Sequence, residues 1–123
     1  MAHVQGPQDT AKEIRELRYR LSSEPNKPLS QQRFSDLLGV SWSTVARWET
    51  GGRPDPEMLR KLDRLRRVLD ALGEMVRPER RLAFLEQEHP LLLKMRPLDL
   101  LGTEKGAGTV IRLLEGAESG AFV

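Results

Sequence analysis

Three side chains in the segment SWSTVARWE have the chemistry to read the edges of DNA bases. Ser43, Thr44 and Arg47 lie at helical spacing, and the two hydroxyl groups can hydrogen-bond to bases or phosphates. The guanidinium can donate two hydrogen bonds to one guanine. Val45 and Trp48 lie one turn apart and must be buried, so the three polar side chains turn outward. We therefore expect a helix that presents its polar face to DNA.

Further polar and aromatic side chains around this helix are expected to contact the same duplex. Trp42 lies in the first turn, where an exposed indole can pack on a sugar or a thymine methyl. The helix N-terminus adds free N–H groups and the positive end of the helix dipole, both favourable near phosphate. Gln31 and Gln32 begin the preceding helix, which commonly meets the DNA backbone, and Arg53 is a candidate phosphate contact. The predicted DNA-binding residues are Gln31, Gln32, Ser41, Trp42, Ser43, Thr44, Arg47 and Arg53.

The elements that must position these side chains have the spacing of a helix-turn-helix, from Ser30 to Gly51. Ser30 is the expected N-cap of a short first helix, and Ser41 caps the second. Gly39 lies where a left-handed C-cap is expected between them. The apolar face of the first helix consists of Phe34, Leu37 and Leu38. Any one polar residue here also fits an ordinary solvated helix, whereas the caps, the turn and the buried pair together favour DNA binding.

The remainder of the chain is expected to be helical as well, which predicts an all-α protein. Apolar residues recur at helical spacing, and no strand pattern is found. The further expected helices cover about residues 9–22, 57–72, 78–88 and 104–118, with a short helical turn after Pro97. Thr103 is the expected N-cap of the last helix. We divide the chain into a helix-turn-helix DNA-binding domain, residues 1–73, and a small helical domain, residues 74–123.

Composition excludes several classes of protein. The 123 residues contain no Cys, which excludes a disulfide framework and thiolate metal sites. The N-terminus has no signal-peptide pattern, and no apolar run approaches the ~18 residues of a membrane span. A net charge of +2 does not fit a bulk polycation. We expect a cytoplasmic protein without a membrane partner.

Enzyme chemistry has little support in the sequence. His3 and His89 are the two His residues, and neither belongs to a cluster with metal-ligand spacing. Gly102, Gly106 and Gly108 lack the Lys-Ser/Thr ending of a phosphate-binding loop, and no strand precedes them. We expect no catalytic residue, no metal and no cofactor.

A basic run lies in the helix expected over residues 57–72, where five of the eight residues from 60 to 67 are Lys or Arg. Such a cluster can attract phosphates. It can equally be a solvated helix face on which Asp63 and Asp70 pair with the arginines. The sequence does not separate these two interpretations.

Small residues and the C-terminal end suggest close contacts in the second half. Gly106 and Gly108 interrupt a helical pattern at a cost of ~1 kcal/mol each relative to Ala, which indicates close approach of another backbone, either a neighbouring helix or another protein. Phe122 and Val123 are apolar and follow Gly120. Such a terminus is either unstructured or an anchor that inserts into a partner.

The helix-turn-helix segment resembles the lambda-repressor/Xre class of DNA-binding domains, over about residues 13–72. The resemblance rests on the residues that begin the two helices, on the turn between them, and on the Trp-Glu-x-Gly sequence that ends the segment. Its residues are Leu29, Ser30, Gln31, Phe34, Ser35, Leu38, Gly39, Val40, Ser41, Ser43, Thr44, Val45, Trp48, Glu49 and Gly51. In this pattern Glu49 is expected to have a structural role.

Residues 83–122 are similar to the toxin-binding domain of Xre/MbcA/ParS antitoxins. The matching residues are Phe84, Leu85, Pro90, Leu92, Pro97, Leu98, Leu100, Leu101, Thr103, Glu104, Gly106, Val110, Leu113, Leu114 and Gly120. Lys94, Met95 and Arg96 depart from the pattern, because small turn-favouring residues are expected there. The resemblance implies an antitoxin that neutralises a RES-domain, NAD-consuming toxin and binds the operator of its own operon. It also implies that the C-terminal end blocks the toxin, which assigns toxin binding to Glu118, Ser119, Gly120, Ala121, Phe122 and Val123.

Two functions therefore remain open. The first is an autoregulating antitoxin, whose partners are its operator DNA and a cognate RES-domain toxin. The second is a free-standing Xre-family transcription regulator whose C-terminal half only dimerises. Either would bind a palindromic operator as a homodimer, because one small module buries too little surface for tight specific binding.

Overall fold

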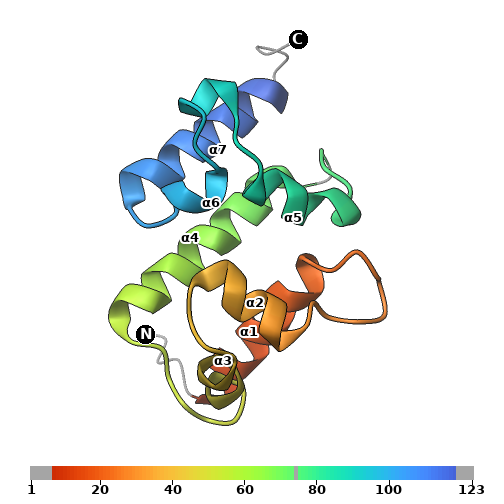
Figure 1. The fold of residues 1–123 in the computed structure, drawn as a ribbon, viewed down its shortest axis with the longest axis vertical. Coiled ribbons are helices and arrows are strands. Elements are labelled where there is room, and N and C mark those ends of the chain that lie inside the picture. Colours follow the sequence, from red (N-terminus) through yellow and green to blue (C-terminus); the bar gives the residue numbers. More distant parts are fainter. Residues whose placement is uncertain (1–6, 74, 119–123) are drawn as a thin grey trace, which may run out of the picture. The chain divides into compact units, whose positions relative to one another are not determined.

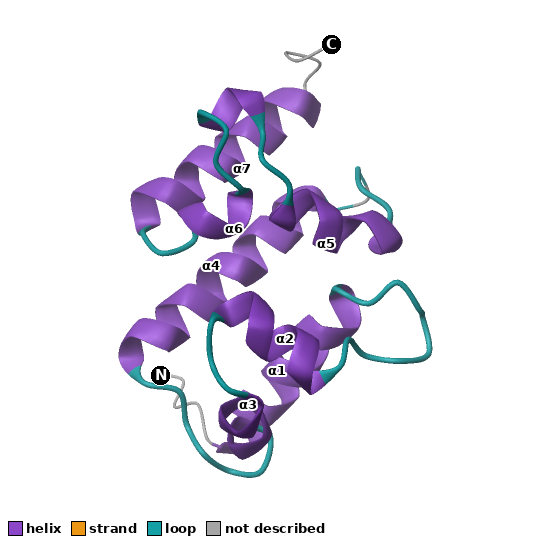
Figure 2. Ribbon diagram, in the orientation of Figure 1, coloured by secondary structure: helices purple, strands orange, loops and turns teal. Residues whose placement is uncertain are grey.

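The computed structural model describes residues 7–73 and 75–118. Every regular element in these ranges is helical (Figure 2), apart from an isolated antiparallel bridge between His89 and Met95. The elements are α1 (Pro7–Arg20), α2 (Gln31–Leu38), α3 (Trp42–Trp48), α4 (Pro56–Leu72), α5 (Pro78–Glu86), the 3₁₀ turn η1 (Pro90–Leu92), α6 (Pro97–Leu100) and α7 (Glu104–Glu118). The all-α prediction is confirmed. Within the described ranges, no helix is long and apolar enough to cross a bilayer.

The chain forms two compact units, Met1–Asp55 and Pro56–Val123. Helices α1, α2 and α3 belong to the first unit, and α4 to α7 belong to the second (Figure 1). The assignment of α4 follows from its packing against α7. The boundary between compact units therefore precedes α4, whereas the functional division expected from the sequence follows it, between residues 73 and 74.

In the first unit the expected caps fix the ends of α2 and the start of α3. The Ser30 Oγ accepts a hydrogen bond from the Arg33 N–H at 3.1 Å. Gly39 ends α2 with φ 72°, a left-handed conformation that glycine adopts without a steric penalty. The Ser41 Oγ then accepts from the Thr44 N–H at 3.2 Å and starts α3. All three predicted caps are confirmed.

The core of the first unit is built from the apolar faces of its three helices. α3 packs against both α1 and α2. The buried apolar side chains are Ile14, Leu17, Leu21, Phe34, Leu37, Leu38, Val45 and Trp48. Each of the larger ones contributes about 1.5–3 kcal/mol through its removal from water. This packing holds one face of α3 inward and leaves the opposite face for solvent.

The second unit is built around α4 and α7. Thr103 Oγ1 accepts the Gly106 N–H at 2.9 Å, which confirms the expected N-cap of α7. α6 also packs against α7, and a Cβ at Gly106 would overlap the carbonyl oxygen of Leu100. The close approach expected at Gly106 is therefore to a neighbouring helix of the same unit.

The segment between α5 and α6 differs from the sequence prediction. α5 ends at Glu86 instead of Glu88, because Gln87 is already extended, with φ −93° and ψ 140°. Pro90 then begins η1, and the chain turns through Leu93 and Lys94, which both have positive φ. Leu93 is 88% exposed. An apolar side chain is thus displayed on the surface of this unit.

Candidate nucleic-acid interface

The N-terminal end of α3 brings three hydroxyl groups together. The Ser41 Oγ lies 3.1 Å from the Ser43 Oγ and 2.7 Å from Thr44 Oγ1. Ser41 and Ser43 are exposed, and Thr44 is partly exposed. Each hydroxyl can donate or accept, so this group can adapt to base edges or phosphate oxygens.

The two Trp residues of α3 have opposite environments. Trp48 is 2% exposed and packs in the core, whereas Trp42 is 52% exposed in the first turn. The helical period accounts for the difference, because the two residues are six positions apart and so lie on different faces of the helix. The prediction of an exposed Trp42 is confirmed.

Arg47 lies on the outer face of α3, toward its C-terminal end. Its side chain is exposed, and within the described residues its guanidinium makes no hydrogen bond or ion pair. Arg53 follows in the loop after α3 and is also exposed. The structure thus leaves the Arg47 guanidinium available for an external partner.

Gln31 and Gln32, at the start of α2, both have partners inside the unit. The Gln31 Nε2 donates to Glu49 Oε2 at 3.0 Å, and the Gln32 Nε2 donates to Asp36 Oδ1 at 2.9 Å. Gln32 is exposed, and Gln31 is partly buried. Contact with DNA remains a prediction for both residues.

A buried ion pair anchors the C-terminal end of α3 to α1. The Arg18 Nη1 donates to both carboxylate oxygens of Glu49, at 2.6 and 2.9 Å, and the side chains are only 11% and 7% exposed. The Arg18 Nε also donates to the Leu29 carbonyl at 2.7 Å. With Gln31, these contacts join α1, the start of α2 and the C-cap of α3. The expected structural role of Glu49 is confirmed.

Sequence reasoning missed the partner of Glu49. Arg18 lies at helical spacing with Ile14, Leu17 and Leu21, which form the inward face of α1 and the turn after it. A charged residue on such a stripe signals a buried partner, because an unpaired buried charge is very costly. That signal was available in the sequence.

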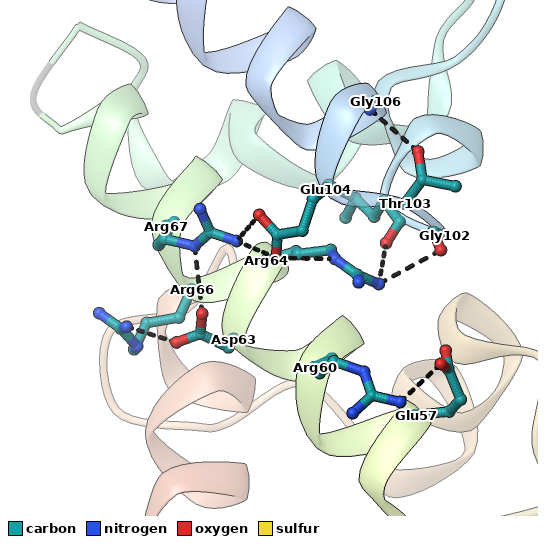
Figure 3. Close-up of polar contacts among 11 residues, drawn as sticks. Glu57, Arg60, Asp63, Arg64, Arg66, Arg67, Gly102, Thr103, Glu104 and Gly106 are labelled. Carbon is teal, nitrogen blue, oxygen red and sulfur yellow. Dashed lines mark hydrogen bonds and ion pairs between the residues drawn. The ribbon is translucent and has the colours of Figure 1, made fainter.

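The basic run of α4 is paired within its own unit (Figure 3). Arg66 contacts Asp63 at 2.6 Å, as Figure 3 shows, and it also contacts Asp70 at 3.1 Å. These are the partners expected under one of the two interpretations. Further ion pairs join Arg60 to Glu57, Arg67 to Asp63, and both Arg64 and Arg67 to Glu104. The structure therefore supports a paired helix face for these arginines.

Glu104 is the centre of this group. The buried Arg64 donates to it at 3.2 Å and also reaches the Gly102 carbonyl at 3.2 Å (Figure 3). Arg67 donates to both of its carboxylate oxygens, at 2.7 and 2.8 Å. The hydrogen bond from Arg67 lowers the pKa of the Glu104 carboxyl from its ordinary value, and the hydrogen bond from Arg64 lowers this pKa by a smaller amount. These contacts fix the start of α7 on α4.

Of the predicted toxin-binding residues, only Glu118 belongs to the described part of the chain, as the last residue of α7. Ser119, Gly120, Ala121, Phe122 and Val123 lie outside the described residues. Among the described residues, no group of three or more His, Asp or Glu side chains could hold a metal ion.

Comparison with protein families matches residues 27–73 to a family described as "Helix-turn-helix". This segment is a helix-turn-helix domain. The match begins before α2 and ends after α4, so the domain includes the first helix of the second compact unit. Its α3 is the second helix of the motif and, with its N-cap Ser41, carries five of the eight predicted DNA-binding residues.

Among solved structures, the chain is similar to one chain of the M. tuberculosis MbcT–MbcA toxin–antitoxin complex. The TM-score is 0.71 with 24% sequence identity, and the alignment covers 92% of this chain and 96% of the other. The helix-turn-helix domain and the helices after it are therefore part of one shared fold. No curated protein is significantly similar in sequence.

Proposed function

We propose that this protein is an antitoxin that binds operator DNA through its helix-turn-helix domain and a cognate toxin through its C-terminal helices. The observation that most supports the antitoxin role is the likeness of almost the whole chain to one chain of a toxin–antitoxin complex. A likeness restricted to the helix-turn-helix domain would favour a free-standing regulator equally. The resemblance of residues 83–122 to toxin-binding domains adds a RES-domain toxin as the partner.

The geometry of α3 supports the DNA-binding half of this proposal. Hydroxyl groups and an exposed indole lie at its N-terminal end, and an exposed guanidinium lies farther along the same helix. A helix of this kind can enter the major groove with its N-terminal residues at the base edges. We propose that a homodimer binds a palindromic operator upstream of the protein's own gene and represses it.

Replacement of Arg47 by alanine is expected to weaken operator binding by about 1–3 kcal/mol, because a bidentate contact to guanine is lost. The measurement is a titration of the duplex upstream of the gene, compared with a duplex of scrambled sequence, at fixed salt. Arg80→Ala, which removes another exposed arginine, from α5, controls for the change in net charge. An equal loss on both duplexes would make Arg47 a phosphate contact instead of a base contact.

Removal of the residues after Glu115 is expected to abolish toxin binding and to leave operator binding unchanged. The truncation deletes the end of α7 and the residues proposed to block the toxin. Co-purification with the product of the neighbouring gene measures the first effect, and the duplex titration measures the second. Phe122→Asp in the full-length chain tests the apolar anchor without shortening α7. Undiminished toxin binding by the truncated protein would contradict the proposed role of the C-terminal end.

A further inference from the structure

We propose that Gly52 sets the base preference of the domain by holding the side chain of Arg47 in one orientation. This inference rests on the proposed DNA-reading function and adds a positioning residue to it. Gly52 itself is not among the residues expected to touch DNA. It would act through Arg47, because its lack of a side chain leaves the space that the stem of Arg47 occupies.

The chain reverses immediately after α3 and returns to Arg47. Gly51 has φ 110°, a conformation that side-chain-bearing residues rarely adopt, and it directs the next residue back toward the helix. The Gly52 N–H then donates to the Arg47 carbonyl at 2.8 Å. Thr50 adds its own N–H and its hydroxyl to the same oxygen, at 3.1 and 3.2 Å. The loop is therefore tied to Arg47 at three points.

The Arg47 side chain passes over the α-carbon of Gly52. A Cβ at residue 52 would lie 2.6 Å from the Arg47 Cγ and 2.9 Å from its carbonyl oxygen, both too close for real atoms. Gly52 has no left-handed φ, unlike Gly51. The need for glycine at residue 52 thus arises from contact with Arg47, and not from the backbone conformation of residue 52.

This contact matters because the outer end of Arg47 is unrestrained. Its guanidinium makes no hydrogen bond or ion pair within the described residues, so packing of the stem against Gly52 is a restraint on its direction. A bidentate contact to guanine needs both N–H groups in one plane with the base edge. A side chain that is already directed loses less rotamer freedom when it binds. Gly52 would therefore favour the guanine-reading orientation of Arg47.

The test compares base preference, which a purely structural role would not move selectively. Duplexes with a randomised central segment are selected with the wild-type chain. Affinities are then measured for the best duplex and for its single base-pair variants. Gly52→Ala is expected to reduce discrimination by about tenfold at the base pair whose preference disappears in Arg47→Ala. In the Arg47→Ala background, the same substitution should change binding little.

Gly39→Ala is the matched control, because a Cβ there meets nothing within 4 Å and Gly39 does not belong to the loop after α3. Its unfavourable φ should lower thermal stability, whereas the base preference read by Arg47 should remain. If Gly52→Ala also lowers the Tm, the loss should shrink in the Arg47→Ala background, since alanine has no Cγ.

Three results would overturn the inference. Unchanged discrimination in Gly52→Ala would show that the contact does not direct Arg47. An equal loss of binding with and without Arg47 would make Gly52 a structural residue only. Lack of any base preference in the wild-type chain would overturn the proposed DNA-reading function itself, and this inference with it.

Discussion

Replacement of Glu49 by alanine is expected to lower the free energy of unfolding of the first unit by about 3–5 kcal/mol. The substitution leaves the guanidinium of Arg18 buried without its carboxylate, and Gln31 also loses an acceptor. Desolvation of an unpaired charge is the largest cost that a single polar substitution can cause. The total free energy of unfolding of a small domain is only about 5–15 kcal/mol, so this variant should be close to unfolding at ordinary temperature.

Tryptophan fluorescence is the appropriate measurement, because both Trp residues of the chain, Trp42 and Trp48, lie in the first unit. Urea titrations of the wild type and the variant would therefore follow unfolding from within this unit. Glu24→Ala is the control in the same unit, because it removes an exposed ion pair with Lys27 whose N–O distance is 4.0 Å. Such a pair contributes at most about 1 kcal/mol to the free energy of unfolding. A difference of less than 1 kcal/mol between the two variants would contradict the role assigned to the buried pair.

A double replacement separates the charge from the packing. Arg18→Met with Glu49→Leu removes both charges together, and apolar replacements of a buried pair are often neutral or stabilising. This variant should recover much of the stability lost in Glu49→Ala. If stability returns but operator binding does not, the pair is needed to fix the orientation of α3 and not merely to keep the unit folded.

The parts of the fold that could be predicted are those that a few neighbouring residues determine. Ser30, Gly39, Ser41 and Thr103 each act within three or four residues of themselves, and all four behave as expected. The outward direction of Arg47 was predictable for the same reason, because the helical period relates it to buried Val45 and Trp48.

The contacts that could not be predicted join distant parts of the chain. Arg18 and Glu49 are 31 residues apart, and Arg64 and Glu104 are 40 apart, so no local pattern relates them. Both arginines lie on otherwise apolar stripes, which indicates burial but not the partner. The contact between Gly52 and Arg47 is local in sequence, yet it depends on the chain reversal at Gly51, whose direction composition alone does not determine.

Two glycines of α7 that look alike in the sequence are expected to respond to alanine in opposite directions. At Gly106 a Cβ would overlap the Leu100 carbonyl oxygen and lie 2.9 Å from its carbon, and backbone atoms cannot move aside cheaply. We expect Gly106→Ala to destabilise the second unit by about 3 kcal/mol, the upper end of the range for overpacking. At Gly108 the nearest atom is the Arg112 Nη1 at 3.3 Å, the end of an exposed and flexible side chain. Gly108→Ala should therefore stabilise α7 by up to about 1 kcal/mol.

The stability of both variants is measured by the loss of the helical circular-dichroism signal during thermal unfolding. Their Trp fluorescence should match that of the wild type, because the second unit contains no Trp. Toxin binding provides the functional readout. The start of α7 is fixed by α6 and by Glu104, so a displaced α7 would misplace the C-terminal residues proposed to bind the toxin. Gly106→Ala should weaken toxin binding, and Gly108→Ala should preserve it. Equal stability of the two variants would mean that α6 can withdraw from α7 without cost, and Gly106 would then have no special role in joining these helices.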